Sequence, residues 1–125
     1  MNTIDLGILG DTIYNASESI IAETENAEEC INDGALLYTL SFGDIRDSAE
    51  ELQLLIDQYG TLEEIKNESI NLYQNVKYIV EDLENEYSSI MTDEVCNSFG
   101  NIRTYVDIIR ESVNTLLSKQ AAWEL

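Results

Sequence analysis

Apolar residues recur at alternating steps of three and four along most of this chain, and no proline interrupts them. This spacing places apolar side chains on one side of an α-helix. The first stripe consists of Leu6, Leu9, Ile13, Ala16, Ile20, Glu23, Ala27 and Cys30, with Glu23 as its only charged member, and three similar stripes follow. Because proline is absent and glycine occurs only 6 times, long helices are permitted almost everywhere. The sequence therefore predicts an all-α protein.

Turn-forming residues divide the first half of the chain into two helices. The first helix is expected near residues 4–32, because Asn32-Asp33-Gly34 supplies a stop in which glycine accommodates left-handed backbone. The second helix is expected to end at Gly60. It begins either near Ala35 or at Ser41, and the pattern leaves both starts open.

Capping residues mark two further helices in the second half. Thr61 followed by Glu64 predicts a capping box at the start of the third helix, whose stripe continues to Ile90. Thr92, followed by two acids, predicts the cap of a fourth helix whose stripe runs to Leu116.

A short repeat relates the two halves of the chain. SFGDIR at 41–46 recurs as SFGNIR at 98–103, 57 positions later. A weaker similarity links residues 13–15 with 65–67. Residues 1–125 are therefore expected to form a single domain of two related helical hairpins, 1–60 and 61–125. Chance similarity under shared heptad constraints is the alternative. Short connections between stripes favour an antiparallel four-helix bundle.

The charge excludes several classes of function. Asp and Glu number 25 against 6 Lys and Arg, so the net charge is −19, and histidine is absent. Such a chain is repelled by nucleic-acid phosphates and anionic membranes, so we expect neither as a direct partner. Without histidine the commonest general base and metal ligand are missing. We expect no enzyme activity, no metal and no cofactor, and the lack of a signal or membrane-spanning stretch favours a cytoplasmic location.

The two cysteines, Cys30 and Cys96, are expected at the same end of the bundle. A buried thiol on an apolar seam is the default for each in a cytosolic protein, and a disulfide between them is the alternative.

Acids on the first helix are the candidate binding residues. Asp11, Glu18 and Glu25 repeat every seven residues and predict one row along the helix. Tyr14 is a candidate aromatic anchor beside this row. The candidate contacts at the end of the helix are Glu28, Glu29 and Asp33. The alternative is a solvated surface that only keeps the protein soluble.

The surplus of acid favours a protein that binds and blocks a basic partner. A rigid acidic helical body can present carboxylates where the phosphates of DNA or RNA would lie. Antitoxins, immunity proteins and phage inhibitors of restriction or CRISPR nucleases act in this way as classes. The expected partner is a basic protein surface on a nuclease, a toxin or a nucleic-acid-binding protein.

Two other classes of function are retained. The residues 4–6 that open the first helix and YIVED at 78–82 resemble features of the helical-hairpin proteins of type VII secretion, which implies a helper or partner role in such a system. The chain departs from that family, since it lacks a Trp-x-Gly turn and its tyrosine motif lies in the third helix. A self-associating structural protein or homodimer is the third class, suggested by aromatic residues beyond those that one seam requires: Tyr73, Tyr78, Tyr87, Tyr105 and Trp123.

Overall fold

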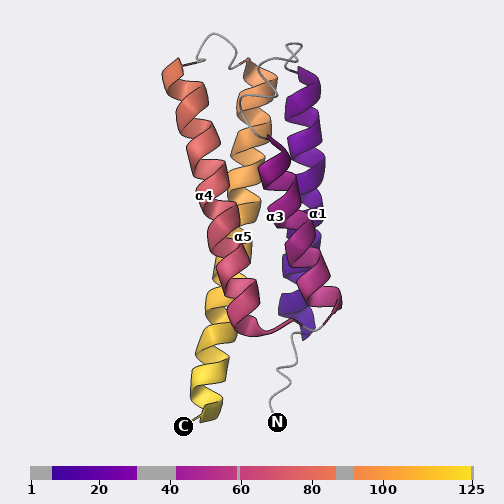
Figure 1. Cartoon of the computed structure of the whole chain (residues 1–125), viewed down its shortest axis with the longest axis vertical. Helices are drawn as coiled ribbons and strands as arrows, with labels where there is room; N and C mark the ends of the chain where they lie inside the picture. Colours follow the sequence, from indigo (N-terminus) through magenta and orange to yellow (C-terminus); the bar gives the residue numbers. More distant parts are fainter. Residues whose placement is uncertain (1–6, 31–41, 59, 87–91, 125) are drawn as a thin grey trace.

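The described part of the chain forms a four-helix bundle. The computed structural model describes residues 7–30, 42–58, 60–86 and 92–124, and these contain helices α1 (Gly7–Cys30), α3 (Phe42–Asp57), α4 (Leu62–Glu86) and α5 (Asp93–Glu124). Figure 1 shows α1 and α4 running upward and α3 and α5 running downward. The helices pack in the ring order α1, α3, α4, α5, so that α1 also packs against α5. The all-α bundle that the sequence predicts is confirmed.

The predicted stripes form one core. Side chains from all four helices are fully buried in it, among them Ile13, Ile45, Leu72 and Ile102. Buried serine and threonine side chains on α1 donate hydrogen bonds to carbonyl oxygens one turn earlier, as Ser17 does to Ile13 at 2.8 Å. The core is therefore continuous along the bundle, and its polar members are satisfied.

Four predicted helix boundaries lie outside the described residues. These are the start of the first helix near residue 4, its stop at residues 32–34, the two starts considered for the second helix, Ala35 and Ser41, and the end of the third stripe at Ile90. The described part of the first helix lies within the predicted 4–32, and α3 is described from Phe42. Helix α5 continues past the end of its predicted stripe at Leu116, and Figure 1 shows its C-terminal end projecting beyond the other helices. Within the described residues, no helix combines the length and the apolar character needed to cross a membrane.

Both predicted N-terminal caps in the second half are present. The Thr61 amide donates to Glu64 Oε1 at 3.0 Å, and the Glu64 amide donates to Thr61 Oγ1 at 3.1 Å, which completes the capping box. The hydrogen bond from the Thr61 amide, helped by the Thr61 hydroxyl, holds the pKa of Glu64 below its ordinary value of 4.5. At α5 the Val95 amide donates to Thr92 Oγ1 at 3.3 Å. These caps fix the starts of α4 and α5.

The repeated motif occupies equivalent places in the two hairpins. Phe42 and Phe99 both enter the core, where their ring centroids lie 5.7 Å apart. Arg46 on α3 pairs with Glu28 on α1, and Arg103 on α5 approaches a glutamate on α4 in the corresponding way. That the two hairpins arose by duplication stays a prediction. These contacts show only that the repeated Phe and Arg residues have similar positions in the two hairpins.

Candidate functional site

The predicted row of acids lies along the side of α1 that borders α3. Asp11, Glu18 and Glu25 are all exposed, and each step of seven residues advances about 10 Å along the helix. Glu18 Oε2 accepts a hydrogen bond of 2.7 Å from Gln53 Nε2 on α3. The row is therefore part of a surface that both helices share.

Tyr14 lies on the same side of α1 as this row and is half-buried. Its backbone carbonyl oxygen lies 3.4 Å from Gln53 Nε2, the same amide group that donates to Glu18. Gln53 thus holds α3 against α1 beside Tyr14. The ring is positioned in the acidic surroundings that the sequence predicts.

The acids at the end of α1 differ from one another. Glu28 is half-buried and forms an ion pair with Arg46 of α3, in which the side chains are 22% and 33% exposed, respectively. Glu29 is exposed. Asp33 lies outside the described residues. Of these three candidate contacts, Glu28 therefore already has an internal partner, and Glu29 remains available at the surface.

Helix α3 adds acids that the sequence analysis did not include. Its exposed acids are Asp44, Asp47, Glu50, Glu51 and Asp57. With Asp11, Glu18, Glu25 and Glu29 they form nine exposed carboxylates, which we call the α1/α3 acidic face. The two helices together hold eleven acids and one base, and that base, Arg46, is paired. The spacing of the α3 acids, on the side opposite its apolar stripe, was the available signal.

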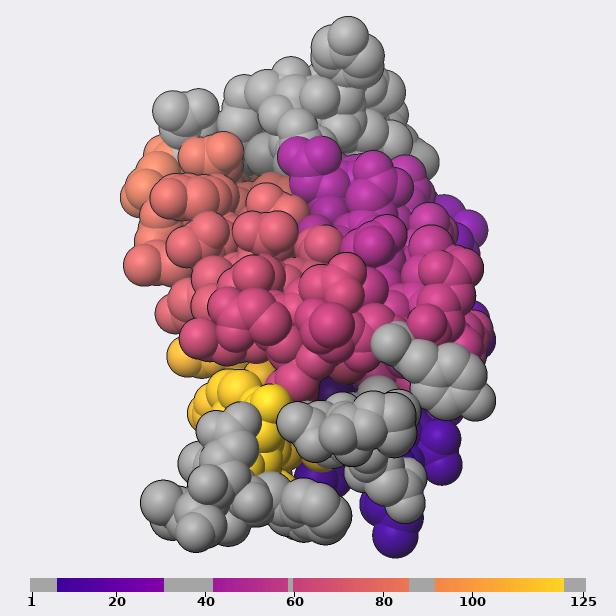
Figure 2. Space-filling view, turned by 60° about the horizontal axis from the view of Figure 1, so that its bottom comes forward, coloured from indigo at the N-terminus to yellow at the C-terminus, as the bar shows by residue number. Residues whose placement is uncertain are grey.

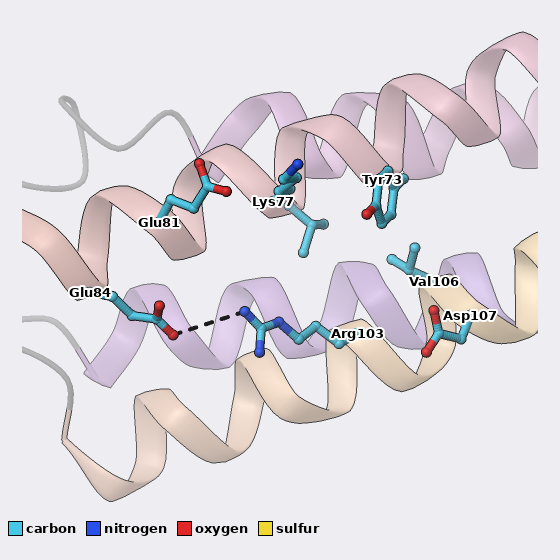
Figure 3. Close-up of a pocket in the computed structure, with 8 residues that line it drawn as sticks. Tyr73, Lys77, Glu81, Glu84, Arg103, Val106 and Asp107 are labelled. Carbon is cyan, nitrogen blue, oxygen red and sulfur yellow. Dashed lines mark ion pairs between the residues drawn. The ribbon is translucent and has the colours of Figure 1, made fainter.

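The other hairpin has a different surface. Helices α4 and α5 contain twelve acids and five bases. A shallow groove of about 390 Å³ lies between them, and Figure 3 shows the side chains that line it. Arg103 and Glu84 face each other across it at 4.0 Å, and both are more than half exposed. Arg110 stacks over the Tyr73 ring, 4.2 Å from its centroid. The groove is lined by Tyr73, Val76, Lys77, Glu81, Glu84, Arg103, Val106 and Asp107.

The cysteines are not where the default interpretation places them. Cys30 and Cys96 are both exposed, and no disulfide joins them. The expectation of buried thiols is wrong, because Cys30 lies at the last residue of α1 and Cys96 lies on the side of α5 turned away from the core.

No chemical centre emerges from the described part of the chain. There, no three side chains of His, Cys, Asp or Glu come together as metal ligands would. Comparison with protein-family models, curated proteins and solved structures found no match. The distribution of charged residues on the surface is therefore the remaining indication of function.

Proposed function

We propose that this protein is a non-catalytic inhibitor or neutraliser that binds the basic surface of another protein through the α1/α3 acidic face. The observation that carries this proposal is the unequal distribution of bases. Among the described residues, each hairpin exposes nine carboxylates, but the single base of α1 and α3, Arg46, is already paired with Glu28, whereas α4 and α5 carry five bases.

Like charges at this density destabilise the folded chain by repulsion, and lysine one turn away would relieve it. Helices α4 and α5 contain three lysines and two arginines, and α1 and α3 contain no base beyond Arg46. A surface that only maintains solubility has no reason to favour one hairpin. The asymmetry therefore supports a role in binding.

The shape of the face suits a basic groove. The bundle is an elongated body (Figure 1). Exposed carboxylates along two neighbouring helices, α1 and α3, carry negative charge down one side of it. A groove built for nucleic-acid phosphates attracts such a body over long range, which speeds association and makes binding sensitive to salt. A nuclease, a toxin or another nucleic-acid-binding protein is the kind of partner that fits.

Two less polar side chains offer anchors within this charged surface. Tyr14 is half-buried between Asp11 and Glu18 along α1. Leu54 on α3 is 47% exposed and has Glu50, one turn earlier, as a neighbour on the helix surface. Charges steer association, whereas desolvated apolar and aromatic side chains supply much of the affinity. We expect these two residues to fill apolar recesses in the partner.

A pair of charge-matched variants tests the proposal. The partner is first captured from bacterial lysate on the immobilised protein, eluted with a salt gradient, identified and purified. The face variant neutralises four exposed acids of α1: Asp11→Asn, Glu18→Gln, Glu25→Gln and Glu29→Gln. The control variant neutralises four exposed acids of the other hairpin: Asp107→Asn, Glu63→Gln, Glu81→Gln and Glu111→Gln. Glu28 is left intact because of its structural ion pair.

Both variants carry the same net charge, so only the position of the change differs. At about 0.5 kcal/mol per lost contact, the face variant should raise Kd about 30-fold, whereas the control should change it by less than about threefold. Equal losses in both variants would show that only net charge matters, which contradicts the proposal. A helical partner that stays bound at high salt and ignores both variants would favour the secretion-partner alternative.

A further inference from the structure

The outward side of α4 carries a ridge of five residues spaced four apart. We call Lys66, Ile70, Gln74, Tyr78 and Asp82 the α4 ridge. Ile70 is 43% and Tyr78 is 62% exposed, and both are among the few large hydrophobic side chains that the described surface exposes. Gln74 and Asp82 are exposed and Lys66 is half-buried. Figure 2 shows the outer surfaces of α3 and α4 side by side on one face of the molecule.

The chemical order along this ridge is self-complementary. It runs cation, apolar, amide, apolar, anion, with Gln74 at its centre. If a second copy runs antiparallel about a two-fold axis at Gln74, Lys66 faces the Asp82 of that copy. Ile70 then faces Tyr78, and this arrangement occurs twice, as an isologous contact requires. Packing between ridges of residues four apart is also the commonest way for two helices to cross.

The local charge permits two copies to approach here. Each chain carries −19, so most pairs of surfaces repel each other. Residues 66–82, which the ridge spans, contain two lysines and three acids, a balance of only −1. Helix α4 packs against α3 and α5 and lies diagonally across the ring from α1. A contact through the α4 ridge therefore leaves the acidic row of α1 on the far side of each copy.

We propose that the α4 ridge is a homodimerisation surface whose partner is a second, antiparallel copy of the same ridge. A contact made by one helix from each chain is smaller than a standard interface of about 1,600 Å². The dimer is accordingly weak and forms at concentrations on the order of 100 µM. This inference is independent of the proposed function, which uses the other hairpin.

Charge exchange at the ends of the ridge tests the pairing. Analytical ultracentrifugation of the full chain should show a monomer–dimer equilibrium. Lys66→Glu and Asp82→Lys should each raise the dimer Kd about tenfold, because each creates two like-charge contacts. The double variant restores both pairs and should return the Kd to within about threefold of the wild-type value.

An effect of net charge alone would change the dimer Kd of Asp82→Lys in the opposite direction. Asp82→Lys lowers the repulsion between copies and would tighten a dimer formed through any other surface, whereas the ridge contact predicts weakening. The proposal is overturned if the wild-type chain stays monomeric up to about 500 µM, if Asp82→Lys tightens the dimer, or if the double variant fails to recover.

The two-fold axis has a separate test. In a background with Cys30→Ser and Cys96→Ser, Gln74→Cys introduces a single thiol in each chain. In the proposed dimer the two introduced thiols lie beside each other at the two-fold axis, within the spacing that a disulfide needs. Mild oxidation should link this variant into covalent dimers. Asn15→Cys, on an exposed position of α1, is the matched control and should remain monomeric. Equal cross-linking of the two variants would contradict an axis at Gln74.

Discussion

Glycine has opposite roles at two positions of this bundle. At Gly60, between α3 and α4, a Cβ would lie 2.6 Å from Leu55 Cδ2 and 3.2 Å from the Leu55 carbonyl oxygen. That oxygen accepts the Gly60 amide at 2.7 Å, which closes the turn. At Gly100, inside α5, an added Cβ would meet no atom within 4 Å apart from the adjacent backbone of its own helix and its two chain neighbours. Only the first glycine is required by close packing.

Alanine substitutions should therefore act in opposite directions. Gly100→Ala should stabilise the protein by about 0.5–1 kcal/mol, because alanine favours a helix interior over glycine. Gly60→Ala should destabilise it by about 1–3 kcal/mol through crowding against Leu55. Urea unfolding followed by circular dichroism measures both free energies. A loss of stability in Gly100→Ala would contradict this account.

The capping box makes one part of the stability depend on pH. Hydrogen bonds from Thr61 lower the pKa of Glu64, so its charged form is favoured in the folded state. The stabilisation is present above the ordinary value of 4.5 and is lost as pH falls through the lower, folded value.

This dependence can be isolated with Glu64→Gln, which keeps an acceptor oxygen but removes the charge. The difference in unfolding free energy between wild type and variant should be constant at neutral pH and should shrink as the pH falls below 4.5. An NMR titration of the Glu64 carboxyl group checks the cause directly. A midpoint at or above 4.5 would show that the hydrogen bonds do not favour the carboxylate.

At the scale of helices, the two hairpins contain corresponding ion pairs of unequal strength. Arg46 and Glu28 join α3 to α1 while partly buried, with side chains 33% and 22% exposed. Arg103 and Glu84 join α5 to α4 at 4.0 Å while 58% and 59% exposed. Solvent screens the second pair much more strongly.

The matched substitutions Arg46→Gln and Arg103→Gln produce the same net charge and should differ in stability. Arg46→Gln should cost about 1 kcal/mol, and Arg103→Gln should change stability by less than about 0.5 kcal/mol. A double-mutant cycle with Glu28→Gln should assign the larger loss to the α1–α3 pair. Equal losses would show that net charge, and not the contact, determines the effect.

The helices were predictable from the sequence because their signals are local. Apolar spacing located the core residues, and the Thr61 and Thr92 caps located two helix starts. The row from Asp11 to Glu25 was predictable for the same reason, since its period is a property of one helix.

The remainder of the site depended on contacts between helices. Which side of α3 borders α1 is set by packing, so the sequence did not reveal that Gln53 contacts Glu18 or that Arg46 neutralises Glu28. The exposure of the α3 acids, such as Glu50, was predictable from their spacing, but their position beside the α1 row was not. Cys30 was predicted to be buried because it continues the apolar stripe of α1. It is exposed because it is the last residue of that helix.

At the scale of the molecule, the bundle separates two surfaces. The α1/α3 acidic face carries nine exposed carboxylates without a free base on these helices, whereas α4 and α5 carry mixed charge around a shallow groove. We propose that the first surface binds a basic partner and that the second binds a copy of the same chain. A bound partner should therefore shield carboxylates on one hairpin only.

Carboxyl footprinting of the partner complex tests this claim most directly. Brief labelling of exposed Asp and Glu with a carbodiimide and an amine, read by mass spectrometry, compares each carboxylate in the free and bound chain. The account predicts at least about fivefold protection of Asp11, Glu18 and Glu25, with unchanged labelling of Glu63 and Glu111. Full labelling of the α1 row in the complex, together with protection on α4 and α5, would contradict it.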